Sequence, residues 1–325
     1  MNNNLPKLVV DTRYLLSPLS IDNINFELII SKGVDVICVN LSSYSYNKQE
    51  RWQWFVNTLS KGVYGRKNTF SKDKILEERA FSGDYLELAS VVLDMIEQNK
   101  NIVRLALNLE DLLRNKEEGL LSVLFILDSN NIEGDAFLHQ FYAKLGIFLI
   151  NSKGYPEIYQ SYLLSDAEII SKIKKGSLIE IDLSLTFENE LREKLKFDTE
   201  FKEAYEKYQI LYEKFIDEPR NEVLEDHLSR MLDKLNRALS INYESFTTEL
   251  TRVRNLIESS QDIPDSDASS FICIGSNISK YTLHPKKMDE NIDLSIINDI
   301  LIQNAYSDSD ISKITGLNFI HRFLL

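Results

Sequence analysis

Side chains that bind transition metals are few and scattered in this sequence. The chain contains 4 histidines and 2 cysteines. The histidines are His139, His227, His284 and His321, and none of them has a second histidine at the spacing of a ligand pair. Structural or surface roles are therefore predicted for His139, His227 and His321, and we expect a protein without a metal or any other cofactor.

Three carboxylates stand where acid–base chemistry could take place. Asp11, Glu133 and Asp182 each lie in or shortly after an apolar run, as residues at the end of a buried strand do. A carboxylate there can act as a general acid or base when its surroundings bring its pKa near the working pH. For Asp11 and Asp182 a plainer role, as structural hydrogen-bond acceptors, is the interpretation we favour.

Motifs for phosphate binding and for nucleophilic hydrolysis are missing. Segment 62–69 carries two glycines, but only two residues separate Gly62 from Gly65, and Asn68 follows Lys67 where a phosphate-binding loop needs Ser or Thr. A surface turn is predicted there. Neither G-x-G-x-x-G nor G-x-S-x-G occurs in the chain.

Seven short apolar runs rich in β-branched residues predict strands that are buried on both faces. They are residues 8–10, 34–39, 121–127, 146–150, 178–183, 238–242 and 271–274. Segments with helical period lie between them, including 85–98 and 133–144. Strands that alternate with helices predict a mainly parallel sheet.

Residues 187–235 differ from the rest of the chain because they are dense in Glu and Lys. Tyr205, Tyr208, Tyr212 and Phe215 recur there at spacings of three and four, which predicts amphipathic helix, with a hint of strand only at 208–211. The segment exceeds a minimal strand–helix unit, so it is our first candidate for a partner-docking element. No Pro/Gly/Ser-rich linker divides the chain, and we expect a single domain over 1–325.

Ordered fragments along the chain resemble the membrane (renal) dipeptidase family. They are residues 8–13, 132–135, 141–146, 178–184, 219–221, 274–277 and 304–319, the last of which includes a helix-capping pattern, Ser307 followed three residues later by Asp310. The family consists of zinc-dependent (β/α)₈ barrels that hydrolyse dipeptides, and the resemblance spans nearly the whole chain. It implies a single (β/α)₈ barrel of the metallo-dependent-hydrolase type.

The positions that bind zinc in that family are altered here. The family's first strand ends in Asp-x-His-x-Asp, and this sequence reads Asp11-Thr12-Arg13-Tyr14-Leu15, so both ligands are replaced. The bridging glutamate of the family matches Glu133, which is retained.

Two further ligand positions and both catalytic helpers are also replaced. The ligand histidines fall at Leu185 and near Gln209, the catalytic aspartate at Asn277, and the catalytic histidine around residues 152–154, where no His occurs. One carboxylate cannot hold two divalent ions, and Arg13 would put a fixed positive charge where a cation should sit. The resemblance therefore predicts a barrel without a metal.

The binding residues that the resemblance leaves are Arg220, Glu133, Arg13, Asp11 and Asn277. Arg220 matches the family arginine that holds the substrate's carboxylate, a role suited to the bidentate guanidinium fork. The alternative is that Arg220 has no binding role and only lies in a polar loop. Arg13 and Glu133 are predicted to pair across the former metal site.

The charge balance argues against polyanionic partners. The chain has 37 Lys and Arg against 50 Asp and Glu, a formal net charge of −13, which repels nucleic acids and anionic membranes. Cys38 and Cys273 lie in apolar runs and predict buried free thiols. No run reaches the roughly 18 apolar residues of a membrane span, and we expect a cytoplasmic protein.

These observations lead to one main hypothesis of function and two alternatives. The main hypothesis is a catalytically inactive, metal-free, dipeptidase-like protein that binds a peptide or partner protein, as an accessory subunit in peptide processing or modification, within a homo- or hetero-oligomer. One alternative is a metal-independent enzyme that uses Glu133, Asp11 and Asp182 on a peptide-like substrate. The other keeps hydrolysis through metal ligands elsewhere in the chain.

Overall fold

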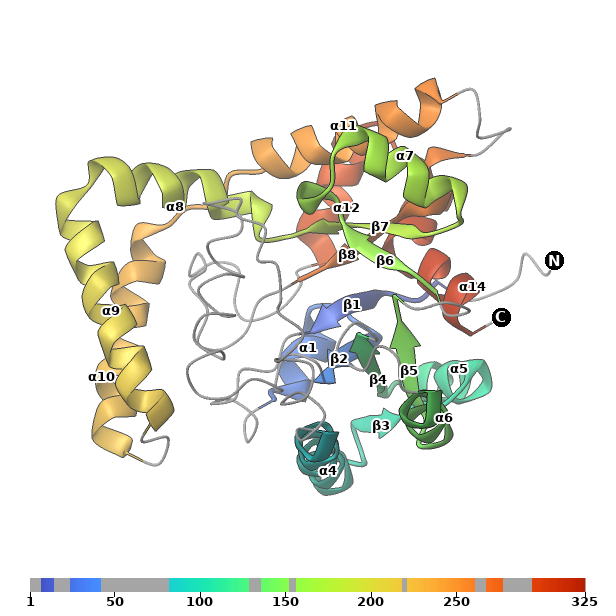
Figure 1. Cartoon of the computed structure of the whole chain (residues 1–325), viewed down its shortest axis with the longest axis horizontal. Coiled ribbons are helices and arrows are strands. Elements are labelled where there is room, and N and C mark those ends of the chain that lie inside the picture. Colours follow the sequence, from blue (N-terminus) through green and yellow to red (C-terminus); the bar gives the residue numbers. More distant parts are fainter. Residues whose placement is uncertain are drawn as a thin grey trace.

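The computed structural model describes residues 7–14, 24–41, 82–128, 136–151, 156–217, 221–260, 267–276 and 294–324. In this part of the chain the fold is mixed α/β, with two parallel sheets and helices packed around them (Figure 1). None of its helices has the length and apolar character needed to cross a membrane.

The strands and helices have the following bounds. The strands are β1 (Val10–Tyr14), β2 (Val36–Asn40), β3 (Val103–Leu105), β4 (Leu121–Asp128), β5 (Ile147–Ile150), β6 (Ile158–Gln160), β7 (Leu178–Asp182) and β8 (Ile272–Gly275). The helices are α1 (Phe26–Ser31), α4 (Ser82–Gln98), α5 (Leu109–Glu117), α6 (Ala136–Lys144), α7 (Asp166–Lys174), α8 (Leu185–Phe197), α9 (Thr199–Asp217), α10 (Glu222–Ala238), α11 (Glu244–Ser259), α12 (Leu294–Gln303), α13 (Asp308–Ser312) and α14 (Asn318–Phe323). A π-helical turn, Lys313–Leu317, joins α13 to α14.

Strand β4 is the centre of the first sheet, whose order is β1-β2-β4-β3 with β5 also paired to β4. β2 pairs along the middle of β4, from Ser122 to Ile126. β3 pairs with the first residues of β4 and β5 with its last. The residues of β4 that pair with β2 include some that pair with β3 and some that pair with β5. β2 therefore lies along one edge of β4, and β3 and β5 both lie along the other edge. The second sheet has the order β6-β7-β8.

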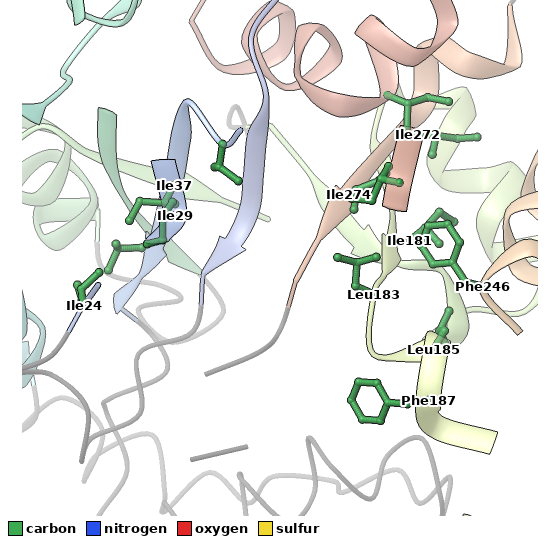
Figure 2. Packing of buried hydrophobic residues seen from close by; sticks show 14 of the residues in the cluster. Ile24, Ile29, Ile37, Ile181, Leu183, Leu185, Phe187, Phe246, Ile272 and Ile274 are labelled. Carbon is green, nitrogen blue, oxygen red and sulfur yellow. The ribbon is translucent and has the colours of Figure 1, made fainter. Parts of the chain in front are cut away.

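Side chains alternate between two buried clusters, as expected of strands covered on both faces. Ile37 of β2, Ile181 of β7 and Ile274 of β8 belong to an outer cluster that includes Phe246 of α11. Figure 2 shows part of this cluster, with Ile181 beside Phe246. An inner cluster takes residues from both sheets. Its buried members are Leu8, Val10, Val36, Cys38, Ala106, Leu112, Leu124, Ile126, Ile150, Ile158, Leu178, Cys273, Phe319 and Ile320.

Polar side chains bridge the two junctions between the sheets. At the first, the Thr12 hydroxyl of β1 donates to the Ile274 carbonyl of β8, at 2.9 Å. At the second, the Asn151 side-chain oxygen after β5 accepts a hydrogen bond of 2.9 Å from the Ile158 N–H of β6. Asn151 adopts a positive φ of 62°, which Asn tolerates better than most residues.

Six of the seven predicted strands correspond to strands of the structure, although β1 begins only at Val10, the last residue of the predicted run 8–10. Residues 238–242 are not a strand. Ala238 ends α10, and residues 239–243 link α10 to α11, where the Ser240 N–H donates to Glu190 of α8. The strand expected at 208–211 is also wrong, because it lies within α9. β3 and β6 were not predicted, since runs of three residues give no readable period.

The predicted helices agree better with the structure. Residues 85–98 lie in α4, and α6 covers the described part of 133–144. The Glu/Lys-rich segment 187–235 consists of α8, α9 and α10 over its described residues. The capping box is confirmed, since Ser307 and Asp310 satisfy each other's backbone N–H at the start of α13.

The π-helical turn packs against β1 through Gly316. A Cβ added at this position would lie 2.0 Å from the Leu8 backbone oxygen and 3.2 Å from a methyl carbon of Val10. The Leu8 backbone cannot move aside as the end of a flexible side chain can. The C-terminal helices therefore pack against the sheet in this way only with glycine at position 316.

We predict that Gly316→Ala lowers the free energy of unfolding by about 3 kcal/mol or more, because the added methyl group overlaps backbone atoms. Urea denaturation followed by circular dichroism measures this. Ser309→Ala, on the exposed side of α13, is the control and should change it by less than about 0.5 kcal/mol. Equal stability of the two variants would contradict the packing described.

Candidate functional site

Strands β1, β7 and β8 place five polar side chains in the interior, here called the strand-end cluster because β7 ends at Asp182 and Ser276 follows β8. All five are almost completely inaccessible to solvent. They are Asp11 (2% exposed), Thr12 (2%), Glu180 (0%), Asp182 (1%) and Ser276 (0%). Buried polar groups at the end of a parallel sheet occupy the place where binding sites of such sheets lie, so this cluster is the candidate site.

Asp11 is fixed by Ser276, the residue that follows β8. Its Oδ1 accepts a 3.1 Å hydrogen bond from the Ser276 backbone N–H, and its Oδ2 accepts a 2.6 Å bond from the Ser276 hydroxyl. Hydrogen bonds to a carboxylate are shorter and stronger than neutral ones. Asp11 therefore joins β1 to β8, which agrees with the structural role favoured for it.

Thr12 connects three strands through one hydroxyl group. Its Oγ1 lies 2.8 Å from Oε2 of Glu180 in β7 and 2.9 Å from the Ile274 carbonyl oxygen in β8. A hydroxyl has a single proton to donate, so these two acceptors share it. Thr12 thus positions the Glu180 carboxylate in the interior.

Gly275 leaves the space that Glu180 occupies. A Cβ at residue 275 would lie 2.7 Å from the carboxyl carbon of Glu180, so any side chain there would displace the Glu180 carboxyl group. The end of β8 and the side chain of β7 are therefore fitted to each other, and Glu180 fills the interior between them.

Asp182 shapes the turn that follows β7. Its Oδ1 accepts a 2.8 Å hydrogen bond from the Ser184 N–H, and α8 begins at the next residue, Leu185. Leu185 stands where the resemblance places a ligand histidine, and it is 7% exposed within the outer cluster. The second such position, Gln209, lies in the middle of α9.

Both cysteines are buried free thiols, as predicted. Cys38 of β2 and Cys273 of β8 belong to the inner cluster. Burial raises the pKa of the Cys38 thiol well above its ordinary value, and the nearby charges of Asp11, Cys273 and Glu180 raise it further. The Cys38 thiol is therefore protonated and a poor nucleophile.

Most of the predicted binding residues are not among the residues that the structure describes. Glu133, Arg220 and Asn277 are outside the described residues, and Arg13 is described only as part of the backbone of β1. The pairing of Arg13 with Glu133 stays a prediction. Of the predicted set, the structure places Asp11 in the strand-end cluster.

Residues that the sequence reasoning missed include Thr12, Glu180 and Ser276. The signal for Glu180 was present, because two carboxylates two residues apart inside an apolar run, Glu180 and Asp182, must point to the same face of a strand. β4 also ends on a carboxylate residue, Asp128, five residues before Glu133. Within the described ranges, no three His, Cys, Asp or Glu residues converge as metal ligands.

The overall fold is similar to solved dipeptidase and metallopeptidase structures. One is a probable dipeptidase from Pseudomonas aeruginosa, with a TM-score of 0.50 and 12% identity over 97% of this chain and 94% of that chain. Another is a metallopeptidase from Rhodobacter sphaeroides, liganded with a phosphinate mimic of the dipeptide L-Ala-D-Ala, with a TM-score of 0.55 and 9% identity over 97% and 99%. No family model and no curated protein matches the chain. At these identities the likeness establishes the fold.

We predict that Thr12→Val lowers the free energy of unfolding by about 2–3 kcal/mol, because the buried Glu180 carboxylate loses a donor that valine cannot replace. Thr12→Ser keeps the hydroxyl and should cost about 1 kcal/mol, for the lost methyl group. Chemical denaturation of the three proteins measures the difference. A valine variant as stable as the serine variant would show that the bond to Glu180 contributes nothing.

We also predict that the thiols stay unmodified in the native protein. The raised pKa of Cys38 keeps its thiolate fraction below that of the unfolded chain between about pH 7 and pH 9, and burial blocks access to both sulfurs. Mass spectrometry after iodoacetamide treatment should find no label natively and two labels in denaturant. Native labelling that rises through this pH range would contradict the burial.

Proposed function

We propose that this protein is a dipeptidase-like (β/α)₈ barrel without zinc-dipeptidase activity, which binds a peptide or a partner protein as an accessory subunit in peptide processing or modification. The observation that carries the proposal is the strand-end cluster. Its carboxylates, Asp11, Glu180 and Asp182, accept hydrogen bonds from the protein's own donors and hold the strands in place.

Three observations support the barrel. Among the described residues, eight parallel strands contribute to two sheets, and the sheets share the inner cluster. Side chains bridge both junctions between the sheets, through Thr12 at β1 and β8 and through Asn151 at β5 and β6. The likeness to a dipeptidase and a metallopeptidase covers 97% of the chain.

Residues at the former ligand positions support the proposed absence of zinc chemistry. Arg13 stands where the resemblance calls for a ligand histidine, and its permanent charge repels a divalent cation. Leu185 stands at another ligand position and packs into the outer cluster. Asp11, the carboxylate residue of β1, already accepts two hydrogen bonds from Ser276.

Peptide binding rests on Arg220. The metallopeptidase of similar fold holds a mimic of a dipeptide, which shows that this fold accommodates such a ligand. In the present chain the retained Arg220 supplies a guanidinium that can bind the terminal carboxylate of a peptide through two parallel hydrogen bonds. In this proposal Asn277 and the predicted pair of Glu133 and Arg13 are further candidates for peptide binding, and the free thiols fit a cytoplasmic location.

We predict that the dipeptide L-Ala-D-Ala at millimolar concentration raises the melting temperature of the wild-type protein, because a ligand that binds only the native state stabilises it. Arg220→Ala should abolish the shift, and Arg220→Lys should retain part of it, since lysine keeps the charge without the fork. Differential scanning fluorimetry measures the shift, and the C-terminally amidated dipeptide is the matched control. An equal shift with the amide, or in Arg220→Ala, would refute carboxylate recognition by Arg220.

A further inference from the structure

The amino ends of β7 and β8 carry exposed cationic side chains, here called the basic patch. They are Lys174 and Lys175, at the end of α7, and Arg322 in the last turn of α14. Figure 1 shows α14 at the side of the fold where β6 and β7 begin. The patch therefore lies at the opposite end of the strands from the strand-end cluster. In barrels the chemistry takes place at the carboxyl ends, so the cations of this face have a different role.

Arg322 is held between backbone and an aromatic ring. Its Nη1 lies 3.1 Å from the position that a Cβ at Gly176 would occupy, so the guanidinium lies against bare backbone next to Lys175. On its other side the guanidinium carbon is 5.7 Å from the ring centroid of Phe271, the residue before β8. A guanidinium that stacks on a ring keeps the N–H groups at its edge for a carboxylate. Arg322 is therefore positioned in advance to bind an acidic group.

The end of α7 is fixed by contacts of its own. Nζ of Lys172 lies 3.8 Å from the ring centroid of Tyr159 in β6. The Ser177 hydroxyl donates a hydrogen bond of 2.8 Å to Oε2 of Glu157, the residue before β6. These contacts join the turn after α7 to the start of β6 and engage the carboxylate of this end. The two lysines of the patch are thus carried by a well-packed turn.

The helix dipole explains only part of the placement of these cations. A cation in the last turn of a helix complements the dipole, which accounts for Lys174 in α7 and Arg322 in α14 taken one at a time. It does not account for the meeting of the two helix ends, because like charges repel one another. The acidic residues Asp166 and Glu168 lie in the first turn of α7, at its other end. A surface that gathers charges of one sign favours a partner of the opposite sign.

The charge of the whole chain favours a partner of moderate charge density. The formal net charge is −13. An approaching acidic protein is therefore oriented so that its acidic segment meets the positive part of the surface. A nucleic acid carries its charges along its whole length, and the rest of this chain repels it. Carboxylates that are spaced along a peptide match a small patch better.

We propose that the basic patch docks an acidic segment of a partner protein. Arg322 binds one carboxylate through two parallel hydrogen bonds, and Lys174 and Lys175 bind its neighbours along the segment. This surface is separate from the Glu/Lys-rich segment 187–235, and the proposal does not depend on what the strand ends bind.

Fluorescence anisotropy with a labelled deca-glutamate peptide tests the proposal on the full chain. We compare the unchanged protein with the double variant Lys174→Glu and Lys175→Glu. The matched control is the double variant Lys202→Glu and Lys207→Glu, at two exposed lysines of α9 that change the net charge equally. Arg322→Lys and Arg322→Gln test the guanidinium, and a labelled oligothymidylate of the same length tests the choice of partner.

The unchanged protein should bind the peptide saturably at low salt, and the patch double variant should bind it about tenfold more weakly or worse. The control double variant should lose less than about twofold, and Arg322→Gln should lose more than Arg322→Lys, which keeps the charge without the fork. If circular dichroism shows that the patch variant does not fold, Lys174→Gln with Lys175→Gln takes its place, with a loss of about threefold.

Three results would overturn the proposal. One is the absence of peptide binding by the unchanged protein. Another is an equal loss in the two double variants, which would show that net charge alone sets the affinity. The third is tighter binding of the oligothymidylate than of the peptide, which would make phosphate the preferred group.

Discussion

The structure depends on the junction between β1 and β8, where Asp11 and Thr12 reach across to the second sheet. Asp11 accepts two hydrogen bonds from Ser276, and Thr12 donates toward the Ile274 carbonyl and the Glu180 carboxylate. Buried polar groups are costly unless they are paired, so each of these residues constrains the others. Gly275, without a side chain, leaves room for Glu180 at this junction. Asp182, two residues after Glu180, then shapes the turn that leads into α8.

The same arrangement limits the chemistry at the strand ends. A carboxylate that abstracts protons or binds a metal must present an oxygen to the ligand. In this protein the oxygens of Asp11 face Ser276, and one oxygen of Asp182 faces the backbone of the following turn. These groups act as structural acceptors, and Glu180 and the two buried thiols share the interior with the apolar side chains of the inner cluster. This use of the polar residues supports the binding role that we propose.

The sequence predicts helices and strands well where a periodic or continuous pattern of apolar residues is long enough to recognise. The amphipathic stripe of Tyr208, Tyr212 and Phe215 predicts α9, and the apolar runs predict six strands, because burial on two faces demands them. Residues 238–242 mislead because an apolar run can also be a link between helices: of the five only Leu239 is buried, and the backbone N–H groups of Ser240 and Asn242 donate to α8. The spacing of Glu180 and Asp182 shows that they share a face of the strand, but the partner of Glu180 could not be predicted, because it is a threonine 168 residues away.

The most direct test of the account is the metal content and activity of the purified protein. Elemental mass spectrometry on protein prepared without chelator is combined with a dipeptidase assay with and without added zinc. The account predicts negligible metal and no hydrolysis in either condition. About two zinc ions per chain together with turnover, or turnover that persists under chelator, would contradict it.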